Sequence, residues 1–411
     1  MNPIQWFLKI LEKMISSVLS KKRLLNQAAI MVAARTLGMG FAAAGSIWAA
    51  RCMGPRNYGI SGMVLSVVAQ TSLVFGLMSP TVLVREYKNT DAEKERNDLI
   101  RTATTFTFLL SVSLAAIGII LFTLHLFPKE YHFAGWFFAP LLICTTLQPS
   151  WVFQAAERQH FESMIAVLQP FLMAALYLAL FKPGMPAGSD LAVNASVCVV
   201  VTTVYWFAVY RLTSFRGTPF RWETVKRLGG LIRKSAWLFI SGLAIYVYTT
   251  LEQPLLGWLY SVEELGKYRT ALQLTNAAAS ILGMTAILLF PRFLEWRKRG
   301  LGFLWNRQVK LGWLFAGLGI VGAVGIFFLM PRLYSILFGA QFARAAVPAA
   351  ILITSKLVVV VSGVFVWGLR TDRHYDKLIS FFFIGVACFS LLSNLLFVPK
   401  FGMYATALTN L

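Results

Sequence analysis

The sequence has 411 residues, of which 57% are hydrophobic and 13% are charged. A water-soluble protein of this composition could not cover its surface with polar groups, so we expect a polytopic membrane protein. The formal net charge of +21 does not indicate nucleic-acid binding, because Lys and Arg of membrane proteins collect in the loops on one side of the bilayer. The four cysteines and four histidines are dispersed without ligand spacing. We therefore expect no disulfide framework, no metal site and no cofactor.

Residues 1–25 predict an amphipathic helix that lies on the inner leaflet. A helix over this segment places Ile4, Phe7 and Leu11 on one face, opposite Lys9 and Lys13. An apolar face combined with a basic face is typical of an interfacial anchor. A signal peptide is disfavoured, because charged residues interrupt any apolar core and no small-residue cleavage site follows.

Eleven apolar runs of about 20 residues follow, each long enough to cross a bilayer as a helix. They predict an N-terminal transmembrane lobe over 26–210 and a C-terminal transmembrane lobe over 235–411, joined by a basic cytoplasmic linker over 211–234. The runs lie near 27–50, 58–80, 102–127, 133–153, 164–181, 190–210, 235–260, 268–290, 311–337, 345–369 and 375–398. The tail "FGMYATALTNL" begins like a twelfth span but stops before it could cross, so we expect the sequence to be truncated there.

The distribution of Lys and Arg predicts the orientation. The N-terminal segment and the alternate loops after it carry 27 of these residues, whereas the opposite loops carry eight. The positive-inside rule therefore predicts a cytoplasmic N-terminus.

An even number of spans per lobe means that both lobes start on the same side of the membrane. Any repeat must then be parallel, related by an axis along the membrane normal. A weak internal similarity supports this, because Tyr58-Gly59 in the first hairpin of one lobe aligns with Leu265-Gly266 in the first hairpin of the other. The predicted fold is an all-α membrane protein of two six-helix lobes in parallel pseudo-repeat.

Arg35 lies inside the first span, with Gly38, Ala42, Gly45 and Ala49 at helical spacing after it. A face of small residues indicates close backbone approach or an open cavity, and such a face would direct Arg35 into protein or water. The alternative is snorkelling toward the inner headgroups.

Three further ionisable residues lie in or beside the spans. Lys356 is about a dozen residues from the end of its span, too deep for easy snorkelling, and faces either a cavity or a buried partner. Glu252, next to the helix-breaking Pro254, suits proton coupling or a silent pairing with Arg269 or Lys356. Arg269 either holds a substrate headgroup or anchors its span at the interface. Gln-Pro pairs at 148, 169 and 253 could open helices and expose carbonyl groups, although ordinary proline kinks explain them as well.

These segments resemble the polysaccharide flippases, the Wzx-like branch of the multidrug/oligosaccharidyl-lipid/polysaccharide exporter (MOP) superfamily. The stretch "ARTLGMGFAAAGSIWAARCMGPRNYG" is similar to the family's arginine-bearing first helix and RxLGPxxYG turn, with Met53 where Leu is usual. "FGLMSPTVLVREY", "LFGAQFARAAVPAAILI" and "VPKFGMYATAL" are similar to later family segments in the same order. The long amphipathic N-terminus and the incomplete last helix depart from the pattern.

The resemblance implies a MATE-like transporter of the bacterial inner membrane that flips a lipid-linked oligosaccharide of the undecaprenyl pyrophosphate type by alternating access. It implies membrane lipids as surroundings, and a polysaccharide polymerase and glycosyltransferases as partners. Arg35, Lys356 and Arg269 would meet the pyrophosphate. Amide and aromatic side chains would meet sugar hydroxyl groups, among them Gln70, Gln148, Trp151, Gln154 and Asn276.

Other classes fit the sequence less well. A polymerase or lipid-dependent glycosyltransferase needs a large outer loop, and the outer loops here are short. The short outer loops therefore favour a protein that is not an enzyme, and no GxxxxGK[ST] motif is present, so direct ATP drive is not expected. A cation-drug antiporter of the same superfamily would carry acidic rather than basic groups in its cavity, whereas a flippase for the peptidoglycan lipid precursor would share a basic one.

Overall fold

The computed structural model describes residues 3–123, 128–213, 215–216, 218–220, 228–369 and 376–410. Within its helices, the description leaves out the side chains of residues 3–29, 123, 237–238, 241, 248, 280–292, 294–295, 367–369 and 376–380. This part of the chain consists of α-helices and short 3-10 helices, without a β-strand. The prediction of an all-α protein is confirmed.

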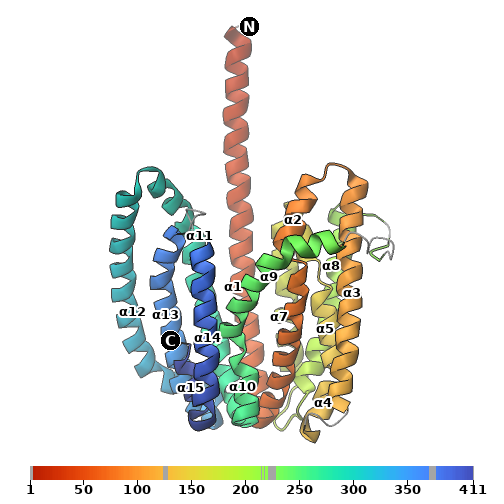
Figure 1. The fold of residues 1–411 in the computed structure, drawn as a ribbon, viewed down its shortest axis with the longest axis vertical. Helices are drawn as coiled ribbons and strands as arrows, with labels where there is room; N and C mark the ends of the chain where they lie inside the picture. Colours follow the sequence, from red (N-terminus) through yellow and green to blue (C-terminus); the bar gives the residue numbers. More distant parts are fainter. Residues whose placement is uncertain are drawn as a thin grey trace.

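The first helix, α1 (Pro3–Ser72), contains two of the expected spans. Gly54 interrupts it with a φ of 73°, a conformation that glycine adopts without steric cost, and Pro55 begins the returning half. The two halves therefore run in opposite directions (Figure 1). Residues 3–29 continue the first half without a break and project beyond the bundle (Figure 1). The surface location predicted for residues 1–25 stays a prediction.

The rest of the N-terminal lobe follows α1 in chain order. Its fourth span is broken into three short helices, whereas its fifth and sixth are continuous. The elements are η1 (Leu73–Leu77), α2 (Pro80–Asn89), α3 (Glu93–Thr123), η2 (Lys129–Tyr131), α4 (His132–Gly135), α5 (Phe138–Thr146), α6 (Ser150–Ala155), α7 (Gln159–Leu180) and α8 (Ser189–Leu212).

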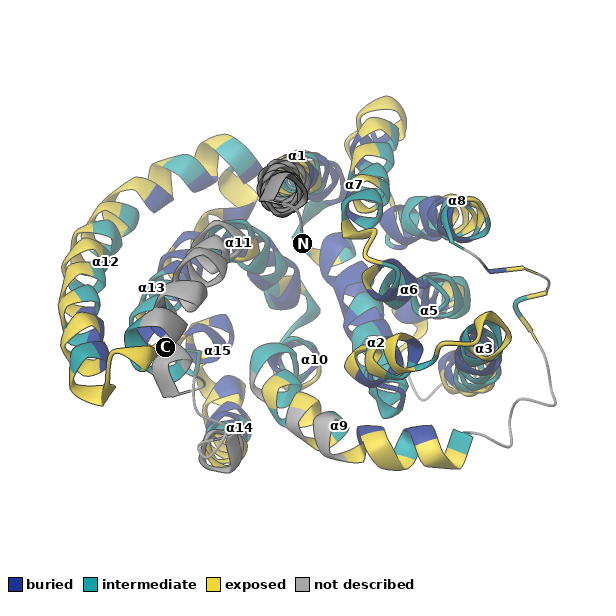
Figure 2. Cartoon of the chain, turned by 90° about the horizontal axis from the view of Figure 1, so that it is seen from above, coloured by how far each residue is buried: buried dark blue, intermediate teal, exposed yellow. Residues whose placement is uncertain are grey.

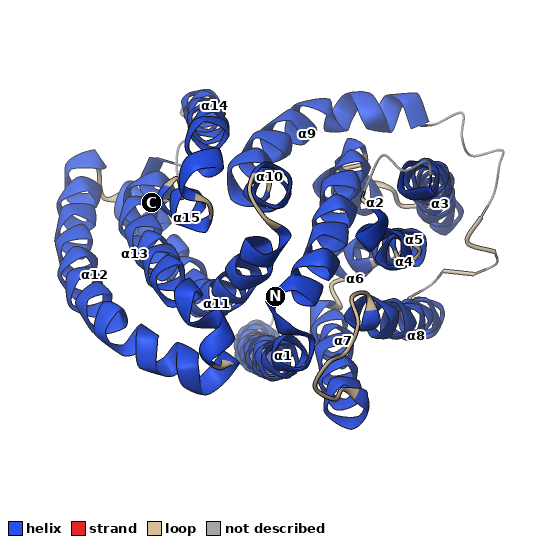
Figure 3. Ribbon diagram, turned by 90° about the horizontal axis from the view of Figure 1, so that it is seen from below, coloured by secondary structure: helices blue, strands red, loops and turns tan. Residues whose placement is uncertain are grey.

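The C-terminal lobe has long helices joined by tight turns. Its elements are α9 (Leu228–Thr250), α10 (Glu252–Leu259), α11 (Val262–Lys298), α12 (Leu301–Phe338), η4 (Ala340–Ala345), α13 (Ala346–Leu369), α14 (Asp376–Phe401) and α15 (Met403–Leu408). The two lobes stand side by side, with α1, α9 and α10 between them (Figures 1 and 3).

The outer surface of the bundle is apolar, as contact with lipid requires. Phe328, Trp313 and Val321 of α12 are 81%, 76% and 73% exposed, which only a hydrocarbon environment makes favourable. Seven described helical segments are long and apolar enough to cross a membrane, or eight if one bent pair counts as a span. The protein is therefore a multi-pass membrane protein.

The start of α9 packs on the N-terminal lobe (Figure 2). Leu231 joins a buried cluster with Met78 and Leu83, and the Ser79 backbone N–H donates a hydrogen bond to Ser235 Oγ over 3.2 Å. From there α9 leads to α10, which contacts α11 and α14 of the C-terminal lobe. This helix therefore connects the two lobes along their seam.

Candidate functional site

Two glycines bring the lobes into backbone contact at the end of the bundle that holds the Gly54 turn, which we call the Gly54 end. A Cβ atom added to Gly59 would lie 1.9 Å from the carbonyl oxygen of Val262 and 2.9 Å from the nitrogen of Gly266. A Cβ atom added to Gly266 would lie 1.9 Å from the carbonyl oxygen of Pro55 and 2.9 Å from the nitrogen of Gly59. The contacts are reciprocal, so a pseudo-twofold axis passes between the two glycines. The hairpins that align in sequence face each other in the structure.

The second half of α1 continues from this contact along the seam with α9 and α10. Ser66 Oγ donates a hydrogen bond to Gln253 Oε1 over 3.5 Å, and Gln70 Nε2 donates one to the Thr250 carbonyl over 3.4 Å. Both bonds cross from one lobe to the other. The structure thus places Gln70, expected to meet a sugar, at the lobe seam.

Arg269 of α11 reaches across the lobe contact into the N-terminal lobe. Its Nη1 donates to the Tyr58 carbonyl over 3.0 Å and to Asp190 Oδ2 over 3.3 Å, while its Cζ lies 4.1 Å from the centre of the Tyr58 ring. The ion pair is largely withdrawn from water, with side-chain exposures of 14% for Arg269 and 2% for Asp190. Such a pair is stable only while both partners are present, because removal of one leaves the other charge buried and uncompensated. The pair connects the lobes close to the Gly59 contact.

A cavity of about 150 Å³ adjoins this ion pair. Ala42, Gly45 and Ala49 of α1 form part of its lining, together with Asp190 and Arg269. Asp190 Oδ1 has no hydrogen-bond partner among the described residues. A buried carboxylate oxygen without a donor is costly, so this arrangement suits a junction that opens.

The sequence analysis did not identify Asp190. It is the second residue of α8 and the first residue of the span expected near 190–210. An acidic residue at the very start of an apolar run is the signal that could have revealed it.

Glu252 lies at the start of α10, directly after the chain leaves α9 at Thr250. Its carboxylate accepts a 2.8 Å hydrogen bond from the Tyr268 hydroxyl and a second one from Asn410 Nδ2. The residue is 2% exposed. Glu252 therefore connects α10 to α11 and to the segment that follows α15.

Lys356 of α13 is half-buried and lies within electrostatic range of Glu252. It makes no hydrogen bond or ion pair within the described residues. The structure thus brings two of the predicted polar residues near each other. Arg269, the other partner considered for Glu252, pairs with Asp190 instead.

Arg35 is exposed on α1 and lies within electrostatic range of Glu162 on α7. The small residues after it pack tightly on that helix: a Cβ atom on Gly45 would lie 2.9 Å from Ala174 Cα. The small-residue face therefore serves close approach of α1 and α7, with the cavity beside Ala42 farther along. Asn276 lies exposed on α11.

Two lobes of membrane-spanning helices related by a parallel pseudo-twofold, with ionisable groups at their contact, define a polytopic membrane protein with a MATE-like architecture. Residues 24–296 match the model of the polysaccharide biosynthesis protein family. The chain belongs to this family.

Solved structures agree with this fold. The chain is similar to "Lipid II flippase MurJ, inward closed conformation", with a TM-score of 0.70 and 11% identity over 94% of this chain and 84% of that chain. It is also similar to an inward-facing multidrug resistance MATE family transporter of the MOP superfamily, with a TM-score of 0.62 and 11% identity over 91% of each chain. No curated protein sequence gives a significant match.

Proposed function

We propose that the protein is a flippase that moves polyprenyl-pyrophosphate-linked oligosaccharide repeat units from the cytoplasmic to the periplasmic leaflet of the bacterial inner membrane. The family and the fold support a membrane transporter of polysaccharide assembly. Glycosyltransferases would supply its substrate on one side, and a polysaccharide polymerase would consume it on the other.

The observation that carries this proposal is a set of cationic side chains within the bundle. Arg269 is held at the lobe contact, and Lys356 is half-buried without a hydrogen-bonding partner among the described residues. Cations at membrane depth are costly unless they serve a substrate or a partner. A pyrophosphate offers concentrated negative charge and many acceptor oxygens, which guanidinium and ammonium groups bind well. The polyprenyl tail would stay in lipid during the transfer.

The mechanism follows from the lobe contact. The Gly59–Gly266 contact and the Arg269–Asp190 pair close the Gly54 end, which the excess of Lys and Arg at the opposite end assigns to the periplasm. This state would accept substrate from the cytoplasm. Rocking of the lobes about the seam would break both contacts and release the lipid headgroup outward. In that step the pyrophosphate would replace Asp190 as the partner of Arg269.

Glu252 is the proposed coupling residue. It links α10 to α11 and to Asn410, which follows α15, and Lys356 lies within electrostatic range of it. Protonation of the carboxylate would weaken its attraction to Lys356 and free the ammonium group for substrate. Loading of the proton and loading of the anion would then favour each other.

A flippase for the peptidoglycan lipid precursor is the second candidate, because the lipid II flippase MurJ shares the fold at a TM-score of 0.70. Both substrates carry a lipid pyrophosphate. Rescue of cells depleted of their lipid II flippase would favour this second candidate. Failure to rescue, together with cytoplasmic accumulation of lipid-linked oligosaccharide in a deletion strain, would favour the first.

The direct test uses proteoliposomes that contain a fluorescent short-chain polyprenyl-pyrophosphate saccharide. Arg35→Ala and Lys356→Ala should each lower the transfer rate at least tenfold, while Arg35→Lys should keep part of it because the charge remains. Arg211→Ala, which removes a surface cation from the end of α8, is the matched control and should transfer at the parental rate. Parental rates in both alanine variants would disprove the role of these cations.

A second measurement separates transport from synthesis. A deletion strain should accumulate a lipid-linked saccharide of normal sugar composition on the cytoplasmic leaflet. An incomplete saccharide would instead indicate a glycosyltransferase. Transport of drug cations without transfer of the lipid would indicate an antiporter.

A further inference from the structure

One of the three Gln-Pro pairs opens its helix. Helix α5 ends at Thr146 and α6 begins at Ser150, so residues 147–149 are unwound within the fourth span. The pair at Gln169 instead stays inside α7, and the pair at Gln253 lies in the first turn of α10. The unwound residues at this break form one wall of a pocket, which a kink within a continuous helix would not do.

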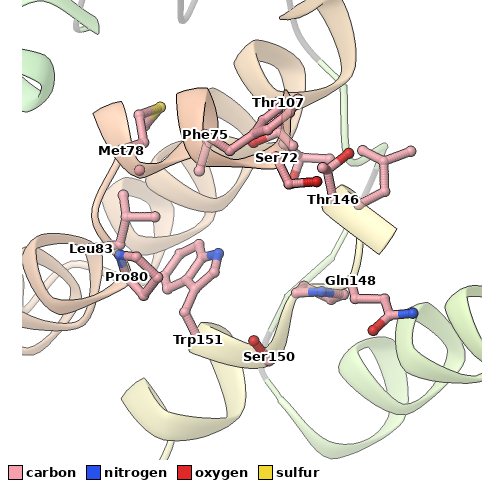
Figure 4. Close-up of a pocket in the computed structure, with 15 residues that line it drawn as sticks. Ser72, Phe75, Met78, Pro80, Leu83, Thr107, Thr146, Gln148, Ser150 and Trp151 are labelled. Carbon is pink, nitrogen blue, oxygen red and sulfur yellow. The ribbon is translucent and has the colours of Figure 1, made fainter. Parts of the chain in front are cut away.

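This pocket has a volume of about 280 Å³ and lies between the end of α1 and helices α2, α3, α5 and α6. Figure 4 shows Trp151 and Ser150 on one side of its open centre and Ser72, Phe75 and Thr107 on the opposite side. Its volume corresponds to roughly nine waters at about 30 Å³ each and lies near the lower limit of small-molecule sites. The space suits one sugar ring.

None of the residues that line this pocket is charged. They are apolar, hydroxyl-bearing or amide-bearing side chains and two glycine or alanine positions. A second pocket of the same lobe, by contrast, is lined by Lys88, Arg96, Glu157 and Arg158. An anionic group would find no counter-charge in the first pocket, so its occupant is neutral.

The pocket offers a hydrogen-bond donor that has no partner in the described part of the chain. Trp151 Nε1 faces the open centre (Figure 4) and makes no hydrogen bond to the described residues. The Gln148 amide, whose Nε2 is buried without a partner there, points away from that centre. A ligand hydroxyl group could accept a hydrogen bond from the indole N–H group, which otherwise lacks a protein acceptor.

Acceptors line the same pocket. Ser72 and Thr146 each use the hydroxyl proton to bond a backbone carbonyl of their own helix over 2.7 Å. Their oxygens keep lone pairs that can accept hydrogen bonds. Thr107 adds a hydroxyl group that bonds nothing in the described chain. Together with the ring faces of Trp151 and Phe75, these groups match the alternating hydroxyl and C–H surfaces of a sugar.

We propose that this pocket binds one uncharged sugar residue of the transported lipid-linked oligosaccharide, an inference that rests on the proposed flippase function. The pocket adjoins the lobe seam, since a Cβ atom on Gly76 would lie 3.2 Å from the ring of Phe239 on α9. The N-terminal lobe would therefore read the glycan while cations of the bundle hold the pyrophosphate. Different residues would then select the sugar and bind the charged pyrophosphate.

The test measures binding to the purified full chain in nanodiscs. The probes are farnesyl pyrophosphate and the same lipid carrying glucose, galactose or N-acetylglucosamine. The variant Thr107→Val/Trp151→Phe removes one hydroxyl and one N–H group; valine keeps the shape of threonine, and phenylalanine keeps an aromatic ring that is smaller than the indole. Thr203→Val/Trp313→Phe makes the same changes at exposed positions of α8 and α12 and is the matched control. Thermal unfolding of all proteins checks that they fold alike.

At least one glycosylated probe should bind the parent and the control more tightly than farnesyl pyrophosphate does. The pocket variant should bind farnesyl pyrophosphate normally and lose that gain, by about 2- to 12-fold per hydrogen bond removed. Equal binding of all probes to the parent, or an unchanged gain in the pocket variant, would overturn the sugar pocket and leave the flippase proposal standing. If the parent bound no probe, both proposals would fail.

Discussion

Asp190 and Arg269 form a buried ion pair across the lobes. Among the described residues, only one oxygen of the Asp190 carboxylate has a hydrogen-bond partner. If the lobes separate, the Asp190 carboxylate must be hydrated, and the Arg269 guanidinium must be hydrated or bind a substrate anion. A buried pair of this kind is strongly destabilised when one partner is removed, by about 3–5 kcal/mol. It therefore contributes to the preference for the closed Gly54 end.

Asp190→Asn is expected to shift the lobes toward separation at the Gly54 end, because Arg269 loses its counter-charge while the side-chain shape is kept. Spin labels at the exposed positions Phe133 and Trp258 report the distance between the lobes. The population with a longer distance should rise about tenfold or more, since 1.4 kcal/mol corresponds to a factor of ten.

The control for this experiment is Asp98→Asn. Asp98 pairs with Arg101 over 3.2 Å within α3, with side-chain exposures of 16% and 17%, so it is a shielded pair that does not cross the seam. Its loss should leave the label distance unchanged. An unchanged distance in Asp190→Asn as well would show that the ion pair does not hold the lobes.

Single charged residues were readily found in the sequence when apolar residues surrounded them. Arg35, Lys356 and Glu252 stood out for this reason, whereas Asp190 was hidden by its place at the edge of a span. The pairing of Arg269 with Asp190 could not be predicted at all. The two residues are 79 positions apart, and they meet only because α8 and α11 both pack against α1.

At the scale of the helices, hydropathy predicted that long apolar helices make up the protein, because a bilayer requires such helices with internally satisfied backbones. It did not predict where a span breaks. Pro149 lies in the break between α5 and α6, as the N-cap of α6, while Pro170 lies within α7. The difference arises from the neighbouring helices that satisfy or leave free the backbone groups near each proline.

Gly59→Ala is expected to abolish transfer. Ordinary Cβ contacts lie at 3.4–4 Å, but this Cβ atom would meet backbone 1.9 Å away. A backbone atom cannot turn aside as a flexible side chain does, so α1 and α11 must separate. Transfer in proteoliposomes and the distance between the same spin labels measure the effect.

Gly317→Ala in α12 is the matched control, because no atom lies within 4 Å of the added methyl group. It should transfer normally and unfold at the same or a slightly higher temperature, since alanine stabilises a helix by about 0.5–1 kcal/mol relative to glycine. Parental transfer and lobe distance in Gly59→Ala would contradict the role of the glycine contact.

At the scale of the whole molecule, the two-lobed parallel architecture followed from counting spans and from the similarity of the two hairpins. The sequence could not reveal that Gly59 and Gly266 touch, because an internal repeat says which positions are equivalent and not whether they meet. In the structure they meet on the pseudo-twofold axis itself. Residues that lie on the axis shift least relative to each other when the two lobes rotate. The contact between Gly59 and Gly266 can therefore serve as a pivot or as the point where the lobes close.

Alternating access requires that the lobes move relative to each other while each lobe stays intact. A thiol crosslink across the seam should therefore stop transfer, and a crosslink within one lobe should not. Ser66→Cys/Gln253→Cys joins the lobes where their side chains lie 3.5 Å apart. Arg56→Cys/Glu130→Cys joins two elements of the N-terminal lobe that form a 2.7 Å ion pair. Both pairs would be placed in a chain whose four native cysteines are replaced by serine, and linked with a short cleavable reagent.

The seam crosslink is expected to lower transfer to the level of empty liposomes, and cleavage of the linker should restore it. The crosslink within the lobe should leave transfer at the rate of its own uncrosslinked form, since rigid-body motion does not change distances inside a lobe. Transfer that continues across a fully crosslinked seam would mean that the substrate passes along the outside of the helices, with the lobes at rest. In that case Arg269 and Lys356 would have to act without any opening of the contact at Gly59, and Arg269, buried at the lobe contact, would lose its access to the lipid headgroup.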